Sequence, residues 1–337
     1  PILFFLVGLA YGLAQDNRTS IDKWDADGII LTDESNTNIN MSMMPKGAIN
    51  EVEADEAAVI GIAPNVIRKK GTSGDDAKIN TTFFGIESDQ FLMPEVIEGK
   101  AFENDDEVVA DISLKEEEGI VIGDTLQLAG SDKEVEVVGF TEDAKFSVAP
   151  VLYTTVSSYQ DVRFEQIDES EEGRVSAIVV RGSDGTVEGV DTGNEDLIVY
   201  PIADYINEIP GYTAQVLTFG LMIGFLVVIA AVVIGIFIYV LTMQKSSMFG
   251  VMKAQGISSG YIAKSVVVQT FLLAAIGVGI GLVLTGATAL VLPPAVPYRT
   301  NLYFLSGIAS LLVIMAMIGG VFSVRAVVKI DPLKAIG

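Results

Sequence analysis

The side chains that most often perform chemistry in proteins are unevenly represented in this chain of 337 residues. It contains neither histidine nor cysteine. The lack of cysteine excludes a disulfide framework, a zinc–thiolate site and a cysteine nucleophile. The lack of histidine removes the commonest metal ligand and the usual general base, which argues against a hydrolase or a zinc enzyme. The groups that remain are carboxylates, phenols, thioethers and amines.

One segment carries acidic residues at the spacing of a calcium-binding loop. Asp25, Asp27, Gly28 and Glu34 occupy positions 3, 5, 6 and 12 of such a loop, but position 1 is Lys23 where an aspartate is required. No helix is expected on either side of the segment. We therefore interpret it as a polar turn that enters a strand.

A phosphate-binding loop of the form GxxxxGK[ST] does not occur in the sequence. The glycine-rich pieces GTSGDD and GSDGT lack the strand-to-helix context that such a loop needs. The chain is therefore not expected to bind ATP by that route, and we do not expect it to be an enzyme. If it performs work, a partner must supply the energy.

Long apolar runs occupy the second half of the chain. No charged residue lies between Glu208 and Lys245, a stretch longer than the ~20 apolar residues that cross ~30 Å of hydrocarbon. Transmembrane helices are expected at 212–243, 261–294 and 301–324. The apolar residues 1–14 are too short to span a bilayer and are interpreted as the outer part of a first, truncated transmembrane helix.

Basic residues set the expected orientation of these helices. Six of the seven basic residues that follow residue 211 fall in one loop and in the C-terminal tail: Lys245, Lys253, Lys264, Arg325, Lys329 and Lys334. Because positive loops stay on the cytosolic side, the segment 244–260 and the tail 325–337 are expected inside the cell. Residues 15–211 are then outside, and the protein is a multi-pass protein of the cytoplasmic membrane.

Residues 15–211 are strongly acidic. They hold 43 of the 44 acidic residues against 14 basic ones, a net charge of −29. This charge argues against nucleic acid or anionic lipid as a partner of the segment. Short β-branched stretches bounded by turn residues predict an α+β domain. Strands are expected at 27–31, 58–63, 81–86, 107–110, 125–128, 134–140 and 176–181, and helices at 94–100 and 199–208.

Glycines recur within the expected membrane helices. Gly220 and Gly224 form a GxxxG pair, and Gly277, Gly279 and Gly281 crowd the next helix. Small residues let helix backbones approach closely in lipid. The pattern therefore predicts close packing, either within one subunit or between two.

The cytosolic segment contains a short amphipathic helix. Met248, Phe249, Val251 and Met252 lie along it, and Gly256 ends it. Two interpretations stay open from the residues alone. The helix lies on the lipid surface, or it docks into the groove of a partner protein.

Several motifs resemble one family of membrane proteins. KSSMFGVMKAQGISSGYI and the terminal VRAVVKIDPLKAIG resemble the coupling helix and C-terminal signature of the FtsX/MacB superfamily of ABC-transporter permeases. EVIEGKAFENDDEVVADISL, GIVIGDTLQLAG and EVEVVGF are similar to the extracytoplasmic core domain of MacB-type permeases. GLAYGLAQDNRTSIDKWDADGIIL is closer still to the haem-exporter branch, the HrtB-type permeases. Met248-Phe249-Gly250 stands where many superfamily members carry a glutamate before the glycine, and this fits the haem branch.

The resemblance implies a fold and a set of partners. The fold is an α-helical membrane protein with four transmembrane helices and a large extracytoplasmic α+β domain, of the MacB core type, inserted between helices 1 and 2. Two copies of the chain form a homodimer in the lipid membrane and bind two copies of a cytosolic ATPase. Residues Met248–Gly256, with Lys253 among them, couple ATP hydrolysis to movement of the outer domain. No cofactor is permanently bound, and haem is the transported ligand.

Haem needs ligands for its iron, and this chain offers no histidine or cysteine. Ferric iron is hard and suits oxygen ligands, and phenolate ligation occurs in haem proteins. Candidates near the membrane surface are Glu34, Met41, Met43, Met44 and Tyr212, with Glu34 preferred. Each has an ordinary alternative: a solvated loop acid for the glutamate, apolar packing for the methionines and an interfacial anchor for the tyrosine.

Two other functions remain open at this point. One is export of an amphipathic drug, peptide or lipid. The other is an FtsX-like mechanotransmitter that transports nothing and controls a cell-wall hydrolase or a sensor through its outer domain. Absorbance in the Soret region after haem addition would separate the haem exporter from both.

Overall fold

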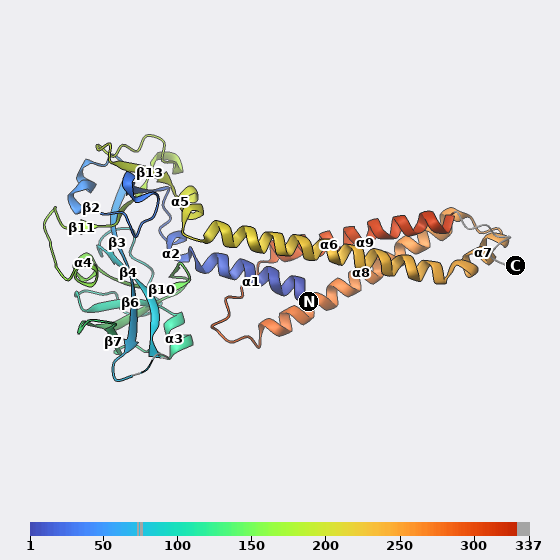
Figure 1. The fold of residues 1–337 in the computed structure, drawn as a ribbon, viewed down its shortest axis with the longest axis horizontal. Coiled ribbons are helices and arrows are strands. Elements are labelled where there is room, and N and C mark those ends of the chain that lie inside the picture. The colour runs from blue at the N-terminus through green and yellow to red at the C-terminus, as the bar shows by residue number, and fades with distance from the viewer. Residues whose placement is uncertain (73, 75–76, 329–337) are drawn as a thin grey trace. The chain divides into compact units, whose positions relative to one another are not determined.

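The computed structural model describes residues 1–328 apart from 73, 75 and 76. The chain forms two compact units (Figure 1). One unit is Leu13–Gln215. The other combines Pro1–Gly12 with the chain from Val216 onward. Most of the predicted tail 325–337 lies outside the described residues.

The unit 13–215 is built on an eleven-stranded mixed sheet. Its main strands in spatial order are β13 (Leu197–Pro201), β1 (Gly28–Thr32), β12 (Ala177–Arg181), β3 (Glu56–Lys69), β4 (Ile79–Ile86), β10 (Ala149–Thr155), β6 (Glu107–Asp111), β8 (Glu134–Thr141) and β5 (Glu98–Gly99). β7 (Thr125–Leu128) pairs with β3 and β8, and β9 (Lys145–Phe146) pairs with β10. β2 (Met44–Pro45) and β11 (Arg174–Val175) form a separate two-stranded sheet.

Short helices connect these strands. The α-helices of this unit are α2 (Thr19–Asp22), α3 (Ser113–Glu118), α4 (Val156–Phe164) and α5 (Ile202–Glu208). The 3-10 helices are η1 (Asp33–Ser35), η2 (Lys46–Glu51) and η4 (Ser183–Gly185). The unit is thus an α+β domain.

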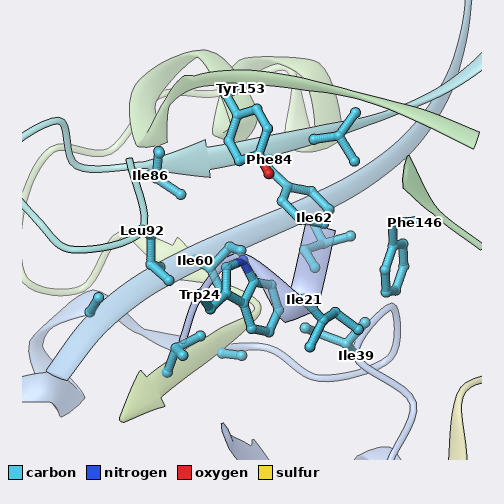
Figure 2. Close-up of a cluster of buried hydrophobic side chains, with 14 of the residues drawn as sticks. Ile21, Trp24, Ile39, Ile60, Ile62, Phe84, Ile86, Leu92, Phe146 and Tyr153 are labelled. Carbon is cyan, nitrogen blue, oxygen red and sulfur yellow. The ribbon is translucent and has the colours of Figure 1, made fainter. Parts of the chain in front are cut away.

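Hydrophobic cores cover both faces of the sheet. Because successive side chains of a strand point to opposite faces, Phe84 of β4 joins a core with Trp24 and Tyr153, whereas Phe83 joins a second core with Tyr159. Figure 2 shows the first core, in which Phe84 lies between Trp24 and Tyr153. Burial on both faces explains why these strands read as nearly continuous apolar runs.

Two glycines make room for α4 on the second face. Gly61 of β3 pairs with Gly85 of β4, and the side chain of Tyr159 lies over both. A Cβ atom at either position would fall 2.2–2.3 Å from that side chain. The Tyr159 hydroxyl is 3.1 Å from Ser176 Oγ on the far side of β3.

Two helix predictions for this domain were wrong. Residues 94–100 are extended, because the backbone N–H groups of Ile97 and Lys100 donate to β8 at the sheet edge. Residues 199–201 belong to β13, and the helix begins only after Pro201. β10 and α4 were not predicted, and β3 extends well beyond 58–63.

The second unit is helical. It contains α6 (Tyr212–Gln244, from Val216 onward), α7 (Ser246–Ala254), α8 (Ser259–Ala289), α9 (Leu302–Val328) and the first eleven residues of α1 (Ile2–Asp16). α6, α8 and α9 are long and apolar enough to cross a membrane, whereas α1 is a shorter apolar helix of 15 residues. α8 ends at Ala289, before the predicted end at Pro294.

Glycines bring some of these helices together. A Cβ at Gly319 of α9 would lie 3.1 Å from Gly235 Cα of α6, and one at Gly281 of α8 would lie 3.2 Å from the Phe4 ring of α1. The predicted pair Gly220 and Gly224 behaves differently, because no atom of the described chain lies within 4 Å of a Cβ built there. Within the described residues, therefore, neither glycine of that pair brings another helix into close approach.

Candidate functional site

The two oxygen ligands predicted for haem iron lie apart. β1 pairs with β13 so that Gly28 is opposite Pro201 and Thr32 is opposite Leu197. Glu34 follows Thr32 in η1, whereas the chain leaves Pro201 through α5 toward Tyr212. Glu34 and Tyr212 therefore lie toward opposite ends of β1, and a five-residue strand is about 17 Å long.

The three methionine candidates differ in exposure. Met44 is buried in a core and pairs with Val175, so it cannot bind a ligand without local unfolding. Met41 and Met43 are 70% and 44% exposed. Ser42 between them accepts a hydrogen bond from the Thr32 backbone (3.1 Å), which holds this loop beside the Glu34 end of β1.

Tyr212 lies in a polar junction between the end of α1 and the start of α6. It is half-buried against the first core, and the Arg18 guanidinium donates a hydrogen bond to it. Arg18 is also held by a short ion pair with Asp22 (2.5 Å). Asn17 Nδ2 donates to Gln215 Oε1 at 3.3 Å. The Arg18 guanidinium therefore lies beside the Tyr212 hydroxyl.

The turn of the β9–β10 hairpin forms hydrogen bonds with the backbone at the C-terminal end of α1. Ser147 and Val148 form the two-residue turn between β9 and β10, both with positive φ (49° and 70°), the pattern of a type I′ turn. Their N–H groups donate to the carbonyls of Asn17 (3.1 Å) and Asp16 (3.0 Å), which satisfies acceptors that a helix end leaves unpaired. A β-branched residue such as Val148 is strained at this φ.

A buried ion pair reinforces the same junction. Asp16 is buried, and its carboxylate lies 3.3 Å from Lys145 Nζ. Burial alone would lower the pKa of Lys145, but the carboxylates of Asp16 and Glu117 raise it above its ordinary value. An acid at a helix C-terminus is unfavourable beside the helix dipole, so Asp16 depends on this lysine.

The predicted coupling segment is the ordered helix α7. Phe249 is only 8% exposed and packs with Ile262 and Val266 of α8, and Met252 joins the same cluster. Met248 and Val251 point outward, at 57% and 43% exposure. The apolar residues of α7 therefore divide into one pair that packs against α8 and another pair that is exposed.

The C-terminal end of α7 is fixed by a glycine cap. Gly256 has φ of 89°, and its N–H donates to Lys253 while the N–H of Ile257 donates to Met252, both at 3.0 Å. These two bonds define a Schellman motif, in which glycine avoids the strain of the left-handed conformation. Gly256 therefore ends α7, as the sequence predicted.

A further constellation was not predicted. The segment 290–301, which connects α8 and α9 at the end opposite α7, crosses α1 (Figure 1). The Tyr298 ring lies on the backbone of Gly8, where a Cβ would be 2.2 Å from Tyr298 Cε2. Tyr298 also stacks on Phe5, with ring centroids 5.5 Å apart and planes 15° apart. The Arg299 N–H donates to the Gly8 carbonyl at 3.2 Å.

Gly12 completes this contact one turn further along α1. A Cβ at Gly12 would lie 2.0 Å from the Pro297 carbonyl oxygen. Gly8 and Gly12 are therefore required by the loop that crosses them. Their four-residue spacing was the available signal in the sequence, but it does not say which distant segment fills the space.

Comparison with known proteins identifies the family. Residues 2–190, more than half of the chain, match the MacB-like periplasmic core domain. Residues 220–332 match the FtsX-like permease C-terminal family. The chain belongs to the FtsX/MacB family of ABC-transporter permeases. This confirms the family that the motifs resembled.

Full-length relatives of the permease are also known. It is 24% identical to the "Putative hemin transport system permease protein HrtB" of Staphylococcus epidermidis, over 100% of this chain and 91% of that protein. It is 23% identical to an uncharacterized ABC transporter permease of Mycobacterium tuberculosis, over 98% of this chain and 90% of the relative. The crystal structure of the periplasmic region of MacB from Actinobacillus actinomycetemcomitans aligns with a TM-score of 0.38 and 13% identity, covering 53% of this chain and 90% of that one.

Membership of this family indicates where the permease is located in the cell. It is a multi-pass protein of the cytoplasmic membrane with an extracytoplasmic domain of the MacB type. As a permease of an ABC transporter, it works with an ATPase partner.

Proposed function

We propose that this permease exports haem from the outer leaflet of the cytoplasmic membrane, using ATP hydrolysed by its partner. The observation that carries the proposal is the full-length match to permeases described as hemin transport proteins. Two permease chains and two ATPase subunits form the working unit. Movement produced by the ATPase at α7 reaches the outer domain through the membrane helices.

The membrane helices support a hydrophobic substrate. α6 has no charged residue along its whole length, and α8 has only Lys264, near its start. A water-filled path needs polar lining groups, and these helices supply few. A substrate that already partitions into lipid, such as haem, can instead be expelled sideways from the membrane.

Tyr212 is the proposed ligand of the haem iron. A phenolate suits ferric iron, and Arg18 supplies a positive charge beside the oxygen. Glu34, Met41 and Met43 form a separate group at the far end of β1. We assign that group no part in iron ligation.

α7 is the proposed docking element for the ATPase. Its outward pair, Met248 and Val251, is small for anchoring in lipid, while Phe249 and Met252 tie the helix to α8. Force applied to α7 is therefore passed to α8 directly. This favours a partner's groove over the membrane surface.

Haem titration of the purified full-length permease tests the function. Binding should produce a Soret band that saturates at one haem per chain or one per two chains. Reconstituted with its ATPase in lipid vesicles, the protein should clear haem from the membrane only when ATP is present. If haem addition produces no Soret band, and a lipid or drug instead moves in an ATP-dependent manner, the proposal of haem export is overturned.

A further inference from the structure

The outer domain carries two exposed methionines in one short segment. Of its four methionines, Met44 is buried in a core and Met93 packs against the first core, as is usual for this apolar side chain. Met41 and Met43 are instead 70% and 44% exposed. Two thioethers therefore face solvent on the extracytoplasmic side of the permease.

Exposure alternates along this segment with a period of two. Met41 and Met43 are exposed, whereas Ser42 and Met44 are buried. This is the pattern of an extended chain, in which residues two apart lie on the same face and about 7 Å from each other. Methionine side chains are unbranched and flexible, so two sulfur atoms at this spacing can converge on one point.

The backbone that carries the two methionines is held by hydrogen bonds. The Ser42 hydroxyl accepts a bond from the Thr32 N–H at 3.1 Å, and the Met41 N–H donates to the Asn38 carbonyl at 2.8 Å. A ligand that joins Met41 and Met43 therefore has to order only the two side chains. This keeps the entropic cost of binding low.

We propose that Met41 and Met43 bind one soft monovalent metal ion, Cu(I) or Ag(I), between their thioether sulfurs. Sulfur ligands select soft ions, whereas magnesium, calcium and manganese prefer oxygen. The chain contains no cysteine and no histidine, so its methionines are the soft ligands that it offers. The net charge of −29 on residues 15–211 attracts cations of every kind, and the sulfur pair supplies the preference among them.

Thioether ligands also determine how the site responds to pH. Thiols and imidazoles must lose a proton before they bind a metal, and their affinity falls as the pH falls. A thioether has no such proton. The affinity of the Met41–Met43 site should therefore be the same at pH 5 and pH 8.

Methionine methyl signals in nuclear magnetic resonance test the site directly. The full-length permease, labelled with carbon-13 at its ten methionine methyl groups, is titrated in nanodiscs with silver nitrate in chloride-free buffer. The Met41 and Met43 signals should shift together and saturate at one Ag(I) per chain, while the Met44 signal stays in place. Met248 of α7 is 57% exposed and serves as a single thioether without a partner sulfur two residues away. It should respond only at about tenfold higher Ag(I) or more.

Single substitutions show whether the two sulfurs act together. Leucine conserves the side-chain volume, and both positions are exposed, so the fold is retained. In Met41→Leu, Ag(I) should bind about tenfold more weakly or worse, and the Met43 signal should no longer shift at one equivalent. Met43→Leu should have the same effect on the Met41 signal. Met93→Leu removes a thioether that packs against the first core and is the control that keeps the wild-type affinity.

Three results would overturn the site. A Met43 signal that still shifts at one equivalent in Met41→Leu would show that each sulfur binds alone. An affinity that falls at pH 5 would assign the ion to carboxylates. A Met248 signal that shifts at the same Ag(I) concentration as the pair would show binding to any exposed thioether.

The metal site and haem export are tested separately. Met41→Leu and Met43→Leu should both give the wild-type Soret band when haem is added. A permease that binds Ag(I) at this pair but no haem would overturn the proposed function and support the metal site. Haem binding without the paired methyl shifts would do the reverse.

Discussion

Lys145 Nζ lies 3.3 Å from Asp16 Oδ2 and joins the last residue of α1 to the sheet of the outer domain. Lys145 is on β9, which pairs with β10, a central strand flanked by β4 and β6. The backbone of Lys145 also exchanges hydrogen bonds with Thr19 Oγ1. The end of α1 is thus tied to the middle of the domain and not to its edge.

We expect Lys145→Met to destabilise the outer domain by about 3 kcal/mol, because removing one partner leaves a buried charge uncompensated. The protein has a single tryptophan, Trp24, which is buried in this domain. Its fluorescence during urea unfolding of the full-length chain therefore reports on the domain alone. Lys70→Met, which removes an exposed pair with Glu134, is the control and should cost less than about 1 kcal/mol.

The same pair should make stability depend on alkaline pH. The pKa of Lys145 is raised above its unfolded value of 10.5, so the folded state holds this proton more tightly than the unfolded state. The stabilisation is complete below pH 10.5 and is lost as pH rises through the higher folded pKa. The difference in unfolding free energy between wild type and Lys145→Met should therefore shrink only above that pH. A difference that shrinks between pH 6 and 9 would contradict this assignment.

The sequence predicted the membrane helices better than the site. Uninterrupted apolar runs located α6, α8 and α9 because lipid imposes a length on each helix. The division of α7 into inward Phe249 and outward Met248 depends on packing against α8, which no local pattern contains. Tyr298 contacts Gly8 from almost the other end of the sequence, so a local pattern could not predict that contact either.

The errors in the outer domain have a similar cause. Within the predicted helix 94–100, Glu98–Gly99 form the edge strand β5 because β8 provides hydrogen-bond partners for the backbone there. Local helix propensity does not contain these partners. Glu34 was preferred as a ligand because an acid so near the membrane surface otherwise gains little, and its part in iron ligation stays a prediction. The direction of β1, which carries it away from the Tyr212 end, follows only from the pairing with β13.

We expect Tyr212→Phe to change the haem spectrum and Glu34→Ala to leave it unchanged. The phenylalanine keeps the ring packed on the core but removes the oxygen beside Arg18. Difference absorbance of the full-length permease with added haem measures both variants. A shifted Soret band in Glu34→Ala, with Tyr212→Phe unaffected, would return iron ligation to the far end of β1.

The last prediction concerns the docking face of α7. Replacing Met248 and Val251 together with glutamate should lower the permease-stimulated ATPase rate of the partner more than about tenfold, because unpaired carboxylates would enter an apolar contact. Both side chains are exposed, so the permease itself should stay folded.

Phe249 and Met252, which pack α7 against α8, provide the control for this experiment. Phe249→Leu and Met252→Leu keep apolar contacts with Ile262 and should leave the stimulated rate close to that of the wild type. Glutamate at those two positions would instead break the packing of α7 on α8, so a loss of coupling there would not identify a docking surface. Full ATPase stimulation by the Met248→Glu, Val251→Glu variant would show that the partner binds elsewhere.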